Sequence, residues 1–167
     1  NFNFNSLKIS FFYFRYGVFV IALVALLNTE DTFCLTYGDG VSDIDINQVI
    51  ALHEKESAEI TISAVQPAGR YGSLSITGNK VNKFLEKPKG DGQWVNGGFM
   101  VCEPSILKRI KNDETILEQD PLIDLADDNQ MAVHKHLGFW AAMDTLRDRK
   151  YLEGLWAEKE APWKVWQ

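Results

Sequence analysis

The sequence contains only two cysteines and no excess of positive charge. Two cysteines in 167 residues cannot form a disulfide framework, and their spacing matches no zinc motif. Because Cys34 and Cys102 lie in apolar, strand-like runs, we expect buried, reduced thiols and a cytoplasmic protein. Lysine and arginine number 17 against 23 aspartates and glutamates, which gives a net charge of −6. Without a basic stripe, nucleic acid is excluded as a partner.

A long hydrophobic run is also missing. The apolar, uncharged run over residues 17–27 is shorter than the ~20 residues that span a bilayer. Lys8 and Arg15 precede it, as in a signal peptide, but no small-residue cleavage site follows. The segment is therefore a signal peptide, a membrane anchor or a stretch foreign to the fold. We expect the third, with residues 1–24 foreign to a domain over 25–167 and no membrane partner.

The stretch FCLTYGDGV (33–41) places a carboxylate directly after a short apolar strand. Ligands of mostly parallel sheets lie just beyond the carboxyl ends of the strands, where Asp39 would sit. Gly38 and Gly40 allow the backbone to turn sharply there and to approach a ligand. A carboxylate in this place can hold Mg²⁺, which prefers oxygen ligands. The alternative is that Asp39 caps an ordinary strand-to-loop turn.

Strand and helix patterns alternate along the rest of the chain. Positions 46, 49, 50 and 53 form one helix face, with His53 at its polar edge. Segments 73–77 and 80–87 form a hairpin around a Gly-Asn turn. Further strands are expected at 59–66, 94–102, 131–137 and 139–143, and helices at 105–110, from 120 and from 145. This order predicts an α/β fold with a mixed sheet.

Three further expectations concern the last third of the chain. Alternation over 131–137 predicts that His134 and His136 point outward, and without a third ligand nearby a zinc role is not expected. Leu152, Leu155 and Trp156 are expected to form the buried stripe of the last helix. The tryptophans of the tail are expected to pack against the body or another subunit.

Five features share one chemistry. Asp39 and Asp144 each follow an apolar strand, and together they would give Mg²⁺ protein oxygens while leaving positions for phosphate and water. Lys87 is a point charge suited to one phosphate, and Glu86 can accept hydrogen bonds from sugar hydroxyls. Asn96-Gly97 can offer backbone groups to the same ligand. The alternatives are helix capping for Asp144 and an exposed hairpin end for Glu86 and Lys87.

Several motifs carry a family resemblance through their order and spacing. They are LTYGDGV (35–41), PAGRYGSL (67–74), EKPKGDG (86–92), NGGF (96–99) and GFWAAMDTLRD (138–148). From about residue 25 onward, the chain resembles the C-terminal half of the sugar-phosphate nucleotidyltransferases. Within that family it is most similar to the glucose-1-phosphate cytidylyltransferases. Residues 151–156 and 161–164 also fit this pattern.

The resemblance implies a Rossmann-like α/β fold and the conversion of CTP and glucose 1-phosphate into CDP-glucose and pyrophosphate. It implies Mg²⁺ as cofactor, with Asp39 and Asp144 as its ligands, and it makes these two and Lys87 the catalytic residues. The residues implied to hold the sugar phosphate are Gly72, Glu86, Lys87, Asn96 and Gly97. It also implies a role in nucleotide-sugar biosynthesis, as for lipopolysaccharide O-antigen, and a homo-oligomer.

The sequence departs from the family in its first part. A Gly-rich loop of the form GGxGTRL and a nearby Lys-Pro segment are absent, and the only glycine before Gly38 is Gly17. We therefore expect an incomplete fold without the nucleotide-binding half, and little or no cytidylyltransferase activity. The alternative is a non-catalytic module that binds a sugar phosphate or associates with a partner through a sheet edge.

Overall fold

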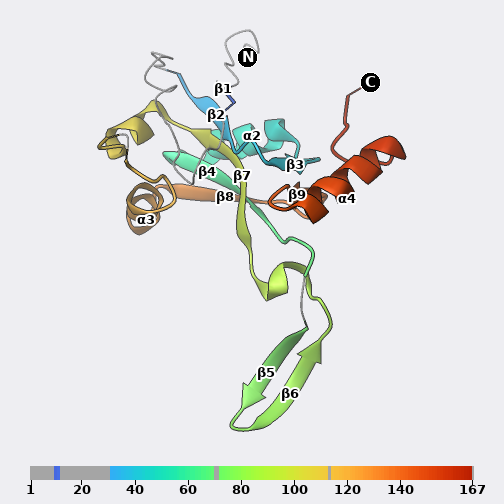
Figure 1. Ribbon diagram of the computed structural model, residues 1–167. Coiled ribbons are helices and arrows are strands. Elements are labelled where there is room, and N and C mark those ends of the chain that lie inside the picture. Colours follow the sequence, from blue (N-terminus) through green and yellow to red (C-terminus); the bar gives the residue numbers. More distant parts are fainter. Residues whose placement is uncertain (1–9, 12–30, 70–71, 113, 167) are drawn as a thin grey trace. The chain divides into compact units, whose positions relative to one another are not determined.

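The computed structural model describes residues 10–11, 31–69, 72–112 and 114–166 (Figure 1). Two compact units share the chain. Of the described residues, the first unit comprises those within 10–11, 31–40, 45–63 and 98–134, and the second comprises those within 41–44, 64–69, 72–97 and 135–166. The predicted boundary between residues 24 and 25 lies outside the described residues.

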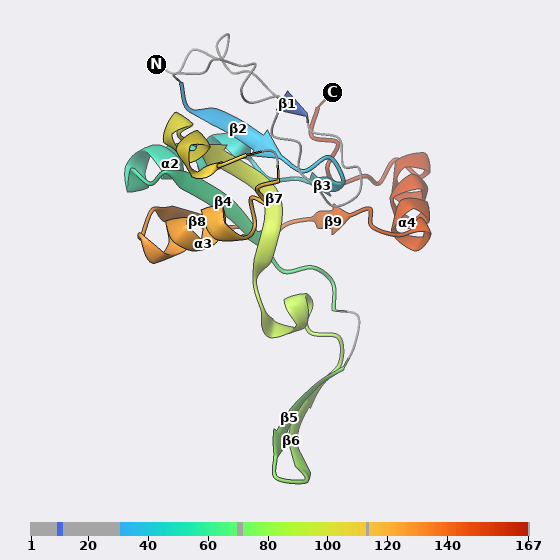
Figure 2. The same cartoon turned by 60° about the vertical axis from the view of Figure 1, so that its left-hand side comes forward.

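The largest sheet has the strand order β1-β2-β7-β4-β8 (Figure 2). Its strands are β1 (Ser10–Phe11), β2 (Phe33–Thr36), β4 (Ile60–Val65), β7 (Val95–Cys102) and β8 (Met131–Lys135). β2 runs parallel to β1 and antiparallel to β7, where Leu35 pairs with Met100. The sheet is therefore mixed, which confirms the predicted α/β class.

The alternation of side chains along β4 separates two faces of the first unit. Ile60 belongs to a core cluster with side chains from β2 and β7 and with Ile106 and Leu125. The latter two come from the 3₁₀ helix η3 (Pro104–Arg109) and from α3 (Asp120–Asp127). Thr61, the next residue, points to the other face and contacts α2 (Ile46–Glu56). The period-2 pattern thus gives each face its own helical cover.

Helix α2 forms where the sequence predicts it, but His53 is not at a polar edge. Asp45 caps the helix by accepting a hydrogen bond from Asn47 N–H (3.0 Å). His53 is 3% exposed, and its ring nitrogens lie 2.9 Å from Thr61 Oγ1 and 3.0 Å from Glu103 Oε1. The prediction was wrong because Thr61 and Glu103 provide hydrogen-bond partners for both ring nitrogens, and this allows the imidazole to be buried.

An ion-pair network closes the same unit near η3. Arg109 donates to Glu59 and to Asp128, each at 2.9 Å, and Ser105 Oγ donates to Glu59. The Arg109 hydrogen bond holds the pKa of Glu59 below its ordinary value. A lowered folded-state pKa adds stability above the unfolded-state value, and that stability is lost as the pH falls through the folded pKa. The network therefore stabilises the unit at neutral pH and fails in acid.

The two cysteines fit the prediction of buried thiols only in part. Both are free; Cys102 is buried, whereas Cys34 is half-buried. Burial raises the pKa of both thiols, which keeps them protonated and unreactive at neutral pH.

Among its described residues, the second unit contains two strand pairs and two helices. Strand β3 (Gly40–Ser42) pairs with β9 (Trp140–Ala142), and β5 (Ser73–Thr77) forms a hairpin with β6 (Lys80–Leu85). The helices are the 3₁₀ helix η2 (Lys89–Gly92) and α4 (Leu146–Ala157). Thr145 and Asp148 form the predicted capping box at the start of α4. Leu152 is buried as predicted, but Trp156 is 53% exposed, so the predicted stripe is narrower.

The prediction for the two histidines of the His-x-His pair was wrong. His136 lies 2.8 Å from Asp43 with its side chain 11% exposed, and His134 is half-buried. Val133 and Leu137 are the exposed residues instead. In the tail, Trp163 stacks on Phe139 with ring centroids 5.4 Å apart, as expected, whereas Trp166 stays exposed. Alternation found the two faces of this strand but not which face is covered.

Within the described residues, no helix combines the length and the apolar character that a bilayer crossing requires.

Candidate active site

Asp39 lies in the turn between β2 and β3, in the first unit, as the sequence predicts. The preceding residue, Tyr37, donates its backbone N–H to Gly98 O (3.0 Å). A Cβ on Gly98 would lie 2.7 Å from the Tyr37 ring, and Gly98 adopts a φ of 76°. The glycine of the NGGF motif is therefore required because the Tyr37 ring occupies the space of a side chain. Asp39 itself is half-buried at the end of this fixed segment.

Lys87 and Glu86 follow β6 in the second unit and are both exposed. Lys87 adopts a left-handed backbone with a φ of 43°, which is rare for a residue with a side chain. A Cβ on Gly69 would lie 2.6 Å from Lys87 C and closer still to Pro88 O. The loop before β5 thus packs directly on the backbone of Lys87, and this contact explains the glycine at position 69. Unusual backbone held by close packing is common at binding sites.

The same packing continues on both sides of Lys87. Gly90 donates its N–H to Pro67 O (2.6 Å). A Cβ on Gly72 would lie 2.8 Å from the Phe84 ring and 3.5 Å from Glu86 Oε2. The structure therefore brings Gly72, Glu86 and Lys87 together at one end of the hairpin. Gly72 precedes β5 and Glu86 follows β6, so the pairing of these two strands brings the residues together.

Asn96 and Gly97 lie in β7, and Gly97 is buried. The carbonyl of Gly97 accepts a hydrogen bond from Trp140 Nε1 (2.8 Å). Trp140 opens β9, and Asp144 follows the end of β9 by two residues, where its side chain is exposed. One tryptophan thus joins the predicted sugar-phosphate segment to the strand that leads into the predicted metal ligand. The sequence contained this residue in a family motif but did not reveal its role.

The side-chain chemistry of Asp39 and Asp144 fits a magnesium ion. Both are carboxylates that follow strand ends, and no ion pair within the described part of the chain uses either of them. Among the described residues, no group of three or more histidines, cysteines, aspartates or glutamates is placed to hold a metal. Two carboxylates with phosphate and water completing the shell are typical of Mg²⁺. The two aspartates belong to different units, so their pairing stays a prediction.

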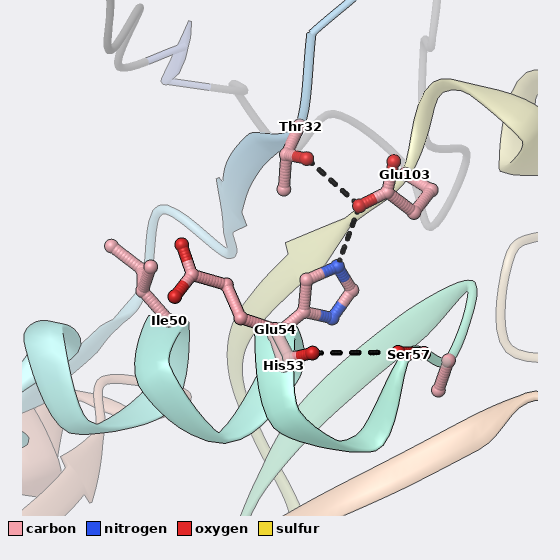
Figure 3. Close-up of a pocket in the computed structure, with 7 residues that line it drawn as sticks. Thr32, Ile50, His53, Glu54, Ser57 and Glu103 are labelled. Atoms are coloured by element: carbon pink, nitrogen blue, oxygen red, sulfur yellow. Dashed lines mark hydrogen bonds and ion pairs between the residues drawn. The ribbon is translucent and has the colours of Figure 1, made fainter. Parts of the chain in front are cut away.

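A cavity of about 330 Å³ lies elsewhere in the first unit (Figure 3). His53 lies in its wall, with Glu103 bridging to Thr32 Oγ1 (2.8 Å). Glu103 only accepts, so the facing Nε2 of His53 carries the hydrogen. The lining includes Glu54 and Glu103 and no lysine or arginine. This cavity is therefore unsuited to a phosphate, and its polar network serves to attach α2 to the strands.

Comparison with known proteins assigns the family. The sequence profile of the Nucleotidyl transferase family matches residues 17–145. The chain belongs to the nucleotidyl transferase family. It is 49% identical over 138 residues to glucose-1-phosphate cytidylyltransferases of Salmonella typhimurium and Salmonella typhi, a match that covers 83% of this chain and 54% of each relative. The chain thus spans about half the length of the curated relatives it matches.

Solved structures of this family share the fold. One is a Bacillus anthracis protein in complex with sucrose, whose name places it among the glucose-1-phosphate thymidylyltransferases. It has a TM-score of 0.61 at 15% identity and covers 81% of this chain and 58% of its own. Another is HddC from Yersinia pseudotuberculosis complexed with GMP-PN, with a TM-score of 0.53 at 19% identity, covering 78% and 57%. At such identities the likeness confirms the nucleotidyltransferase fold and nothing more specific.

Proposed function

We propose that this chain is part of a sugar-phosphate nucleotidyltransferase that forms CDP-glucose and pyrophosphate from CTP and glucose 1-phosphate. The observation that carries the proposal is the 49% identity to glucose-1-phosphate cytidylyltransferases, which extends over 138 residues and 83% of the chain. The second unit supports it, because Gly72, Glu86 and Lys87 gather at one place with the backbone of Lys87 held by Gly69.

The proposed reaction is an in-line displacement at the α-phosphate of CTP. A phosphate oxygen of glucose 1-phosphate forms the new bond to this phosphorus, and the bond to the β-phosphate bridging oxygen breaks to release pyrophosphate. Lys87 binds the sugar phosphate, and Glu86 accepts hydrogen bonds from the sugar hydroxyls. Mg²⁺, held by Asp39 and Asp144, would offset phosphate charge when bound. Positioning and charge stabilisation supply the rate enhancement in such transfers.

The experiment that tests the proposal separates binding from turnover. Calorimetry of the 167-residue chain with glucose 1-phosphate and Mg²⁺ should give a saturable heat. A coupled assay of pyrophosphate release from CTP and glucose 1-phosphate should give little turnover, because the sequence lacks the Gly-rich nucleotide loop. Absence of any heat contradicts sugar-phosphate binding. Robust turnover contradicts the expectation of an impaired chain.

A second candidate function, an interaction module, is favoured by the β5–β6 hairpin. In its register Leu74 lies opposite Phe84 and Ile76 opposite Val81, and each of these side chains is more than half exposed. The other face carries Lys80 and Lys83. An isolated two-stranded hairpin is marginally stable in water, and an exposed apolar face favours association. A second copy fits best, because two such faces are complementary while the lysines stay in water.

We expect a Val81→Ser/Phe84→Ser double variant to weaken self-association at least tenfold. The change removes apolar contact from the exposed face, while Lys83→Ser alters the opposite face and is the matched control. Sedimentation equilibrium over a range of concentrations measures the effect. A chain that stays monomeric at every concentration contradicts the interaction-module candidate.

A further inference from the structure

Asp43 holds the segment that leads into β9. Within the second unit, its Oδ1 accepts a hydrogen bond from Phe139 N–H (2.7 Å) and lies 2.8 Å from His136 Nε2. Its own N–H donates to Phe139 O (3.3 Å), and Ser42 Oγ donates to the same carbonyl (2.6 Å). Phe139 is therefore fixed through both of its backbone polar groups. Asp43 does not cap α2, the next helix in the chain, because Asp45 takes that role.

The surroundings of Asp43 leave little freedom. His136 Nε2 faces two acceptors, Asp43 Oδ1 and Phe139 O at 3.2 Å, so this nitrogen carries a hydrogen. The backbone N–H of His136 donates to Ala64 O (2.9 Å). A Cβ on Gly138 would lie 2.5 Å from Asp43 Oδ1, so the chain passes too close for any side chain. Hydrogen bonds to a half-buried carboxylate are stronger than neutral ones.

The fixed segment reaches the candidate site through the next residue. Trp140 follows Phe139 directly, and its Nε1–H donates to Gly97 O (2.8 Å). The Phe139 ring is also stacked on Trp163, which limits its movement. A displacement of the Phe139 backbone would move the Trp140 indole and with it the support of the Asn96-Gly97 segment.

We propose that Asp43 is a positioning residue for the sugar-phosphate site. It touches no substrate and acts through the Phe139 backbone and the Trp140 indole on the Gly97 carbonyl. The inference rests on the proposed function for the identity of the ligand, but the link from Asp43 to Trp140 is a property of the second unit alone.

The test compares Asp43→Ala, Asp43→Asn and Asp45→Ala. Asp45 is a matched control because it is also a hydrogen-bonded aspartate, but it caps α2 in the first unit. The first readout is the NMR resonance and solvent exchange of the Trp140 indole proton without ligand. The second is the glucose 1-phosphate Kd from calorimetry with Mg²⁺. Asp43→Ala should speed indole exchange and raise the Kd at least tenfold, whereas Asp45→Ala should change neither.

Asp43→Asn and a fourth variant, Trp140→Phe, guard against simple unfolding. Asp43→Asn keeps an acceptor for Phe139 N–H and His136, so it should restore slow indole exchange and a near-normal Kd. Trp140→Phe keeps most of the ring and removes the hydrogen bond to Gly97 through which Asp43 acts, so it should raise the Kd at least as much as Asp43→Ala does.

The outcomes separate the inference from the proposed function. Unchanged indole exchange in Asp43→Ala overturns the inference, whatever the ligand does. An unchanged glucose 1-phosphate Kd in Asp43→Ala also overturns it, whatever the Kd of Trp140→Phe. If the unaltered chain binds no glucose 1-phosphate, the proposed function fails, and with it the assignment of this segment to a sugar phosphate, even where the indole proton responds to Asp43.

Discussion

Replacing Lys87 with alanine is expected to weaken glucose 1-phosphate binding by about 10- to 100-fold. A hydrogen bond to a charged group contributes about 1.5–3 kcal/mol, and this corresponds to that loss in affinity. The effect should be large because the backbone of Lys87 is held in a left-handed conformation against Gly69, and its ammonium group lies 3.5 Å from Glu86, another residue implied to hold the sugar phosphate. Calorimetry with glucose 1-phosphate and Mg²⁺ measures the change.

The control for Lys87 is Lys83→Ala. Lys83 is an exposed lysine of the same hairpin, paired with Ser75 on the face away from the apolar side chains. It has the same charge but is not among the residues nearest to Gly69, so its removal should leave the Kd within about twofold. Equal losses in the two variants would show that only the net charge of the hairpin matters. No loss in Lys87→Ala would remove Lys87 from the site.

Met100→Ala is expected to lower the free energy of unfolding by about 2–5 kcal/mol. Met100 is fully buried in β7, opposite Leu35 of β2, and belongs to the core cluster that includes Ile60 and Leu125. Truncation removes apolar contacts and leaves a cavity, because the backbones of two paired strands cannot collapse into it. Urea denaturation followed by circular dichroism measures the loss.

Met143→Ala is the matched control, because Met143 is the same residue type but 46% exposed in the second unit. Its substitution should change the free energy by no more than about 0.5 kcal/mol. Should the two units unfold in separate transitions, only the transition of the first unit should shift in Met100→Ala. An equal effect of the two substitutions would contradict the assignment of Met100 to the core.

The local elements followed from short-range rules in the sequence. Alternation located β4, a Gly-Asn turn between strands located the hairpin, and the Thr145–Asp148 pair located the start of α4. In each case the pattern reports on backbone geometry that neighbouring residues decide. The family motifs are also short stretches of sequence, and they include the glycines at positions 69, 72 and 98.

Burial was predicted less well, because it depends on partners far away in the chain. His53 is buried because Thr61 and Glu103 are hydrogen-bond partners of its ring nitrogens. His136 points inward because its Nε2–H donates a hydrogen bond to Asp43. Trp156 is exposed although helical spacing placed it on the buried stripe. None of these partners lies within one turn or one strand of the residue concerned, so periodicity could not identify them.

For this protein the sequence by itself determined the α/β class and the family, and it supplied the predicted residues of the candidate site. It did so because strand, turn and capping preferences are local and because the motifs keep their spacing. Only the tertiary structure decided that Gly69 packs on the Lys87 backbone and that Asp43 fixes Phe139. Both contacts join segments distant in sequence, and hydrogen bonds and steric fit across such distances exist only once the chain has folded.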